Sequence, residues 1–212
     1  MRLQLSMNKV ELVRKILVYT VYVLFLTCFQ VSFPDKLSLN GQIADLMFVF
    51  VVLAAYMFGI KDGIIIGIIV GVLRDCFAAP AVVGFNGSVV SSVGIGAFTL
   101  FAVSVFSASV FTVKIKRKPA FALLTLICAT LLYKVFGQGI IYIWTRIFSK
   151  TIYHLSAKEL FVDSILTQIF LNVLASVPIY LLLRFAGPYK TGQNPVLTSQ
   201  EGRGADSSWL TI

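Results

Sequence analysis

The chain has 212 residues, of which 58% are hydrophobic and 13% are charged, and its formal net charge is +9. A soluble domain has about 45–50% apolar and about 25% charged residues, so the composition excludes an ordinary soluble domain and predicts a polytopic membrane protein. The positive charge does not indicate nucleic-acid binding, because the basic residues cluster beside apolar stretches and not along one folded face.

Successive apolar stretches predict an all-α bundle of about six transmembrane helices in one domain. The first stretch follows a basic segment and has no small-residue cleavage site, so we expect an uncleaved span. Pro119 opens the fifth in a favoured first-turn position, and Ser156 to Glu159 form a capping box before the last. The expected spans cover about 16–33, 43–58, 63–79, 88–113, 120–144 and a last stretch that ends near residue 184.

The third span carries a stripe of small residues. Gly59, Gly63, Gly67 and Gly71 recur every fourth residue, and Asp75 takes the next position of the series. Residues four apart share one face of a helix, so this face has no side chains until it reaches a carboxylate. Small residues let another backbone approach closely in a membrane. Two interpretations stay open: packing between two helices of this chain, or a surface that receives a different protein.

The third span is short. The thirteen residues from Gly63 to Asp75 cover about 20 Å, less than a hydrocarbon core of about 30 Å. Either Arg74 and Asp75 lie inside the membrane, or the helix continues to about residue 79 with both on its final turns.

A break at membrane depth follows this span. Pro80 and the stretch from Gly84 to Gly87 interrupt the apolar pattern. Irregular backbone at this depth persists only where protein or trapped water covers it. We therefore expect the segment to be buried.

An intramembrane polar cluster is expected around Lys134, which lies near the middle of the fifth span. A lysine at the bilayer centre costs about 2.5–3.5 kcal/mol on insertion scales, so it should face the bundle interior and have a partner. Asp75 is the nearest acid by depth, and Gln168 and Asn172 of the last span offer hydrogen bonds. The lysine is either structural or part of a ligand or proton site.

No residue pattern indicates catalysis. Cys28, Cys76 and Cys128 lie in or beside apolar stretches without metal or redox spacing, and His154 stands alone in a loop. We therefore predict no enzyme, no metal and no cofactor. The basic run 114–118 is expected to contact anionic lipid headgroups as a topology signal, with a docking site for a cytoplasmic partner as the alternative.

The distribution of basic residues predicts the orientation. Six spans place both termini on one side, and that side carries twelve basic residues against five on the other. The positive-inside rule then places both termini in the cytoplasm. We expect a transmembrane domain over 1–188. The composition changes after Gly187 and Pro188, so we expect a disordered tail over 189–212.

The stretch from Asp45-Leu46 through the glycine stripe to Val72–Asp75, and then Gly84–Gly87, resembles the MreD family of bacterial rod-shape membrane proteins. That family typically shows Pro-Asp-Leu at the start of span two, spaced glycines in span three and an acid at its end. Here Ala44 replaces the proline, and Arg74 directly precedes the acid.

The resemblance implies a scaffold of the cell-elongation machinery in the bacterial inner membrane, with no catalytic residues. Its implied partners are MreC and, through MreC, the glycan polymerase RodA and its penicillin-binding transpeptidase, beneath an MreB filament. The family is also similar to the substrate-binding subunits of energy-coupling-factor vitamin transporters. This similarity supplies a second hypothesis, a membrane subunit that binds a vitamin, another small molecule or a lipid in an outward-facing pocket.

Overall fold

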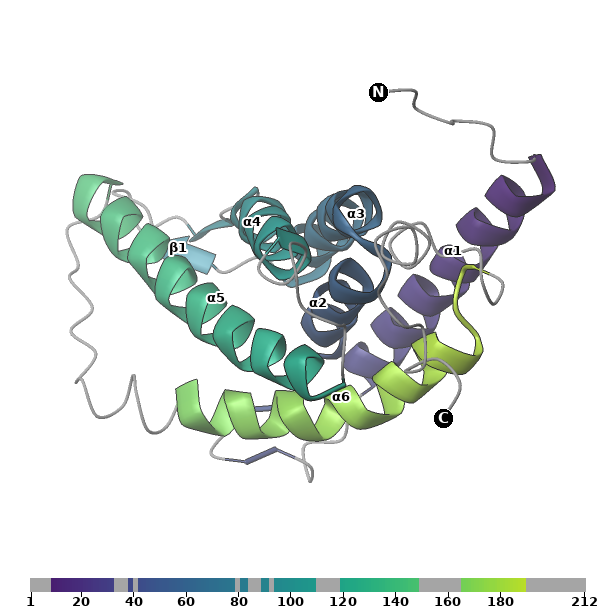
Figure 1. The fold of residues 1–212 in the computed structure, drawn as a ribbon. Helices are drawn as coiled ribbons and strands as arrows, with labels where there is room; N and C mark the ends of the chain where they lie inside the picture. The colour runs from purple at the N-terminus through teal and green to yellow at the C-terminus, as the bar shows by residue number, and fades with distance from the viewer. Residues whose placement is uncertain are drawn as a thin grey trace.

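The structure is a computed structural model that describes residues 9–32, 38–39, 42–78, 81–83, 89–91, 94–109, 119–148 and 165–189. These residues form six α-helices and one small antiparallel sheet of two strands (Figure 1). The elements in chain order are α1 (Lys9–Val31), α2 (Leu46–Phe58), α3 (Ile60–Ala78), β1 (Ala81–Val83), β2 (Val89–Ser91), α4 (Ile95–Ser109), α5 (Pro119–Phe148) and α6 (Thr167–Phe185). The predicted helical class is confirmed.

Three of these helices are long and apolar enough to cross a membrane: α1, α5 over Pro119–Gly137, and α6. Helices α2 and α4 are apolar but shorter, with 13 and 15 residues, which corresponds to about 20 and 22 Å. The protein is therefore a helical membrane protein by length and composition. The six-span topology stays a prediction.

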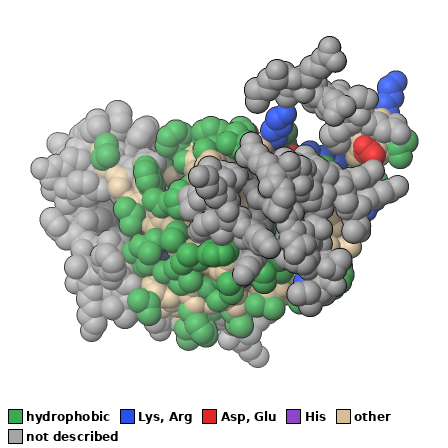
Figure 2. All heavy atoms as spheres, viewed as in Figure 1, with side chains coloured by type: hydrophobic (Ala, Val, Ile, Leu, Met, Phe, Trp, Pro, Cys, Tyr) green, Lys and Arg blue, Asp and Glu red, His purple; other side chains and the backbone are tan. Residues whose placement is uncertain are grey.

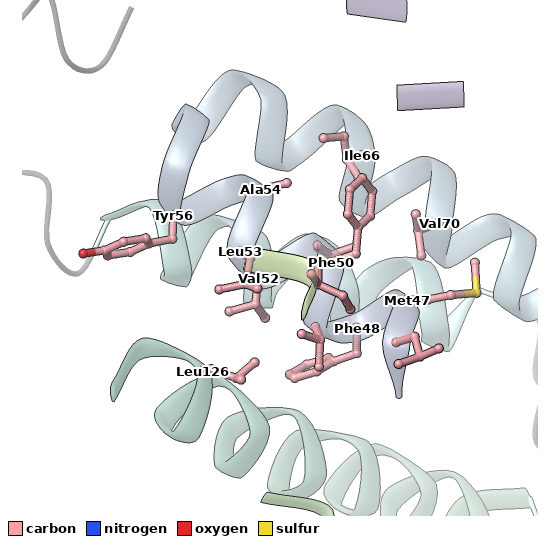
Figure 3. Close-up of a cluster of buried hydrophobic side chains, with 14 of the residues drawn as sticks. Met47, Phe48, Phe50, Val52, Leu53, Ala54, Tyr56, Ile66, Val70 and Leu126 are labelled. Atoms are coloured by element: carbon pink, nitrogen blue, oxygen red, sulfur yellow. The ribbon is translucent and has the colours of Figure 1, made fainter. Parts of the chain in front are cut away.

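Helix α2 lies at the centre of the bundle. All 13 of its residues are buried, and it contacts each of the other five helices in the described part of the chain. Figure 3 shows its side chains directed towards Ile66 and Val70 of α3 on one side and Leu126 of α5 on another. A helix that is apolar on every side needs such cover, because no face of it suits water.

The helix ends gather at two levels. At one level Arg74, near the end of α3, contacts Asp45 at the start of α2, and Asn172, near the start of α6, contacts it as well. At the other, Lys15 of α1 contacts Asp62 at the start of α3 and Tyr189 after α6. We call these levels the Asp45 end and the Asp62 end. Helix α1 and the segment after α6 thus meet at the Asp62 end.

The structure tests the predicted end of α3 and the predicted start of α4. Helix α3 extends to Ala78 with Arg74 and Asp75 on its last turns, which is the second of the two alternatives. The prediction of a fourth span from residue 88 is wrong, because 89–91 pair with 81–83 as a hairpin and α4 begins only at Ile95.

The outer surface is largely apolar. Figure 2 shows apolar side chains over much of the described surface in view, while most of the charged side chains seen there lie beside the first turns of α1. Ile65 of α3 is 56% exposed, and Phe170 and Leu174 of α6 are 60% and 64% exposed. Apolar patches this extensive fit acyl chains better than water.

Candidate functional site

The glycine stripe of α3 faces α2 and α4. A Cβ atom added to one of its glycines would overlap a neighbouring helix, and the nearest atoms are Ala55 Cβ at 2.6 Å for Gly63, the Leu100 carbonyl oxygen at 3.0 Å for Gly67, and Ala97 Cα at 2.4 Å for Gly71. Any larger side chain would separate the backbones. Glycine at these three positions is therefore required by packing within the chain.

Gly59 has a different role from the rest of the stripe. Its backbone φ is 95°, a value that glycine adopts without a Cβ clash. Its N–H donates to the carbonyl oxygen of Ala55 at 3.0 Å and so closes α2. Gly59 makes the turn that sends the chain back along α2 as α3.

These contacts decide between the two interpretations of the stripe. At Gly63, Gly67 and Gly71 the face is occupied by helices of the same chain, so the interpretation as a surface for a different protein is corrected there. Gly84 and Gly87, which were predicted to extend the site, lie outside the described residues.

Asp75 fixes the start of α4. The side chain is 4% exposed, and its carboxylate accepts backbone N–H groups of Gly94 and Gly96 at 2.8 Å and of Ala97 at 3.1 Å. These donors belong to the first turn of a helix, where they lack intrahelical acceptors and where a negative charge is stabilised. A Cβ atom at Gly96 would collide with the carboxylate, and Gly94 has a φ of 104°. The last position of the stripe is thus a cap on the neighbouring helix.

Asp45 joins α2 to α3. One carboxylate oxygen accepts the N–H of Phe48 at 3.0 Å and caps α2, while the other accepts Arg74 Nη1 at 2.6 Å. The guanidinium also lies 5.1 Å from the ring centre of Tyr133 on α5, within cation–π range. The acid that opens the second span and the arginine that ends the third therefore form an ion pair.

Gln168 and Asn172 of α6 organise the backbone that leads into α2. Gln168 Nε2 donates to Asn172 Oδ1 and to the carbonyl oxygen of Ile43, both at 3.0 Å. Asn172 Oδ1 accepts the N–H of Asp45 at 3.0 Å, and its Nδ2 donates to Thr130 Oγ1 at 3.3 Å. Both side chains are at least 94% buried, so these bonds satisfy polar groups that membrane lipid could not.

Lys134 reaches the same segment but not the predicted acid. Its Nζ donates to Gln42 Oε1 at 3.2 Å, and it lies within electrostatic reach of Asp45 and Arg74. The predicted pairing with Asp75 is wrong, because that carboxylate points at the start of α4. Lys134, Gln168 and Asn172 do belong to one polar network, centred on residues 42–45.

Gln30 attaches α1 to this network and was not identified from the sequence. Its amide nitrogen donates to the Ala44 carbonyl oxygen at 3.0 Å, and its amide oxygen accepts the N–H of Leu46 at 2.8 Å. A glutamine near the end of an apolar span was the signal available in the sequence.

A second polar cluster lies at the Asp62 end. Asp62 is 3% exposed and accepts hydrogen bonds from Lys15 Nζ, from Tyr19 Oη at 2.7 Å and from Tyr189 Oη at 2.6 Å. Burial, together with the bond to Asp62, raises the pKa of Tyr189 above its ordinary value, so this hydroxyl remains a donor. Helix α1, helix α3 and the segment after α6 meet at one carboxylate.

This second cluster corrects the predicted boundary of the tail. Tyr189 was assigned to the tail, yet its ring packs against Phe58 with ring centres 5.6 Å apart. The bundle therefore includes residue 189. Residues 190–212, His154 and the capping box at 156–159 lie outside the described residues.

Three aspartates join neighbouring elements of the bundle. Asp45, Asp62 and Asp75 each accept hydrogen bonds from neighbouring elements, and no three His, Cys, Asp or Glu residues in the described ranges lie close enough to hold a metal ion. Fold and site together define a helical membrane protein with a buried central helix and a polar cluster at each of its ends. Comparison of the chain with known protein families, curated proteins and solved structures finds no match.

Proposed function

We propose that the chain is a non-enzymatic scaffold of the bacterial cell-elongation machinery, similar to MreD, that binds MreC. Through MreC it would support peptidoglycan synthesis by RodA and its transpeptidase. The proposal is supported by the structural roles of the residues that resemble the MreD motif. Asp45 caps α2 and pairs with Arg74, Gly67 and Gly71 seat α3 on α4, and Asp75 caps α4. The motif is thus one connected framework of the fold.

The proposed topology has six spans with both termini in the cytoplasm. It is supported by the meeting of Lys15 and Tyr189 at the Asp62 end and by the twelve basic residues assigned to that side. Helices α2 and α4 are shorter than a hydrocarbon core of about 30 Å. The cover of α2 by the surrounding helices supports its place in a membrane despite this short length.

A partner such as MreC must contact surfaces other than the glycine stripe, because α2 and α4 occupy it. Lipid-facing positions on three helices are suited to a test by site-specific photo-crosslinking in the membranes of the source bacterium. Ile65, Phe25 and Phe170 are each more than half exposed, and Val70, which is fully buried, is the matched control.

The proposal expects MreC to be captured from at least one exposed position and not from Val70, with cells that lose the protein becoming round. Failure to capture MreC from every exposed position, with rod shape unchanged on depletion, would contradict it. A vitamin that co-purifies with the chain in mass spectrometry would instead favour the transporter subunit.

A further inference from the structure

The Asp45 end brings two positive charges to one place. Arg74 of α3 bonds to Asp45, and Lys134 of α5 bonds to Gln42. Gln42 lies three residues before Asp45 in the chain. Both side chains are only partly buried, and the Arg74 side chain is 28% exposed. Lys134 lies within electrostatic reach of the guanidinium. Two cations that remain partly accessible can share one anionic ligand.

Both cations lie beside residues 42–45 at the Asp45 end. Arg74 is fourteen residues from the first residue of α3, so it lies about 21 Å along that helix from the Asp62 end, and Lys134 reaches the same level because it bonds to Gln42 beside Asp45. A hydrocarbon core measures about 30 Å, and long basic side chains extend towards the nearer headgroups. The pair is therefore closer to the headgroups on the Asp45 side.

An apolar strip on α5 leads from Lys134 towards the membrane centre. Leu123, Ile127 and Leu131 precede Lys134 by eleven, seven and three residues, spacings that place all four on one helix face. Leu123 and Leu131 are 37% and 38% exposed, and Ile127 is half-buried. The strip extends about 16 Å from Lys134 to Leu123, a length suited to an acyl chain.

We propose that Arg74 and Lys134 bind the phosphate of an anionic membrane lipid whose acyl chain lies along Leu123, Ile127 and Leu131. The phosphate accepts hydrogen bonds from both cations, and the strip supplies the apolar contact that a free anion would not use. This inference rests on the bundle lying in a membrane. It does not depend on the scaffold role, so a bound lipid and a missing MreC contact would be separate results.

Thermal unfolding of the full chain in a neutral detergent tests the site. Three additives separate the parts of the ligand: phosphatidylglycerol, diacylglycerol, which has the chains without phosphate, and inorganic phosphate. A ligand that binds only the folded protein raises Tm in a saturable way. We expect a clear rise with phosphatidylglycerol and little change with the other two. An equal rise with diacylglycerol overturns the role of the cations, and an equal rise with inorganic phosphate overturns the lipid.

Substitution of Lys134 gives the residue-level test. Lys134→Gln should raise the half-maximal lipid concentration about tenfold, because one charge-assisted bond is lost. Lys134→Arg should bind as the parent chain does. Arg184→Gln is the matched control, because it removes a partly buried basic residue at the Asp62 end. Unchanged lipid binding in Lys134→Gln overturns the proposal.

A measurement on the unsubstituted chain covers the case in which Lys134→Gln does not fold. Phosphatidylglycerol with a photoreactive group in its acyl chain should label the peptide that holds Leu123 to Leu131 above the rest of the bundle. Equal labelling of the exposed face of α6 around Phe170 would show that lipid contacts the bundle without preference, which also overturns the proposal.

Discussion

Moving one methyl group from α2 to α3 tests the close approach of these helices. In Gly63→Ala the new Cβ would lie 2.6 Å from Ala55 Cβ and 3.0 Å from Ala55 Cα. Overpacking of this kind costs about 1–3 kcal/mol. We therefore expect the free energy of unfolding of Gly63→Ala to fall by about that amount.

The reciprocal change, Ala55→Gly, removes the Cβ atom that a methyl group at residue 63 would overlap. Ala55 is fully buried, so Ala55→Gly should cost about 1–2 kcal/mol in lost burial and helix propensity. In the double variant the methyl group lies on the other helix and the 2.6 Å overlap is absent. The double variant should therefore lose less stability than the sum of the two single changes, by about 0.5–3 kcal/mol. Recovery stays incomplete, because the 3.0 Å contact with Ala55 Cα remains.

Reversible unfolding in mixed detergent micelles, followed by circular dichroism, measures these differences. Gly137→Ala in α5 is the control, because a Cβ there meets nothing within 4 Å, so it should not lower stability and should raise it by at most about 1 kcal/mol through helix propensity. Additive effects of Gly63→Ala and Ala55→Gly would refute the packing argument. Equal damage from Gly137→Ala would refute it as well.

Three further predictions follow from the two ends of the bundle. Asp75→Asn should destabilise the protein by about 1–3 kcal/mol in the same unfolding assay, and its effect should add to that of Lys134→Met; non-additivity would restore the pairing that the structure excludes. Tyr189→Phe should lower stability by about 1 kcal/mol, because the hydrogen bonds of its hydroxyl are lost; unchanged stability would show that the segment after α6 does not hold the bundle. A topology reporter fused after Arg184 should report cytoplasm and one inserted near Lys150 should report the exterior, whereas the same side for both would contradict six spans.

The helical class and several helix features could be predicted from the sequence, because their signals come from residues that are neighbours in the chain. Composition gave the helical membrane class, and Pro119 marked the first residue of α5. The fourfold glycine spacing predicted close packing, which Gly63, Gly67 and Gly71 show. The start of α4 was misplaced, because it is set by the carboxylate of Asp75, a residue far earlier in the chain.

The contacts of charged residues could not be predicted by depth along the helices. Depth made Asp75 the nearest acid to Lys134, but direction around α3 decides the contact. Asp75 continues the glycine face that packs on α4, while Arg74, one residue earlier and about 100° away, faces Asp45 and the ring of Tyr133. The central position of α2 could not be predicted from the sequence either, because a uniformly apolar helix has no polar face that indicates its orientation.

The internal position of the glycine stripe changes how partner binding can be tested. A leucine at Gly67 would meet the Leu100 carbonyl oxygen and the Ser104 hydroxyl, both 3.0 Å from the position of a Cβ. Loss of a partner in Gly67→Leu would then follow from separation of α3 and α4, so it could not show that the partner contacts α3. Ile65 is two residues away, about 200° around the helix, and is 56% exposed. A substitution at Ile65 leaves the packing of α3 on α4 intact, and so it can separate assembly from folding where a substitution on the stripe cannot.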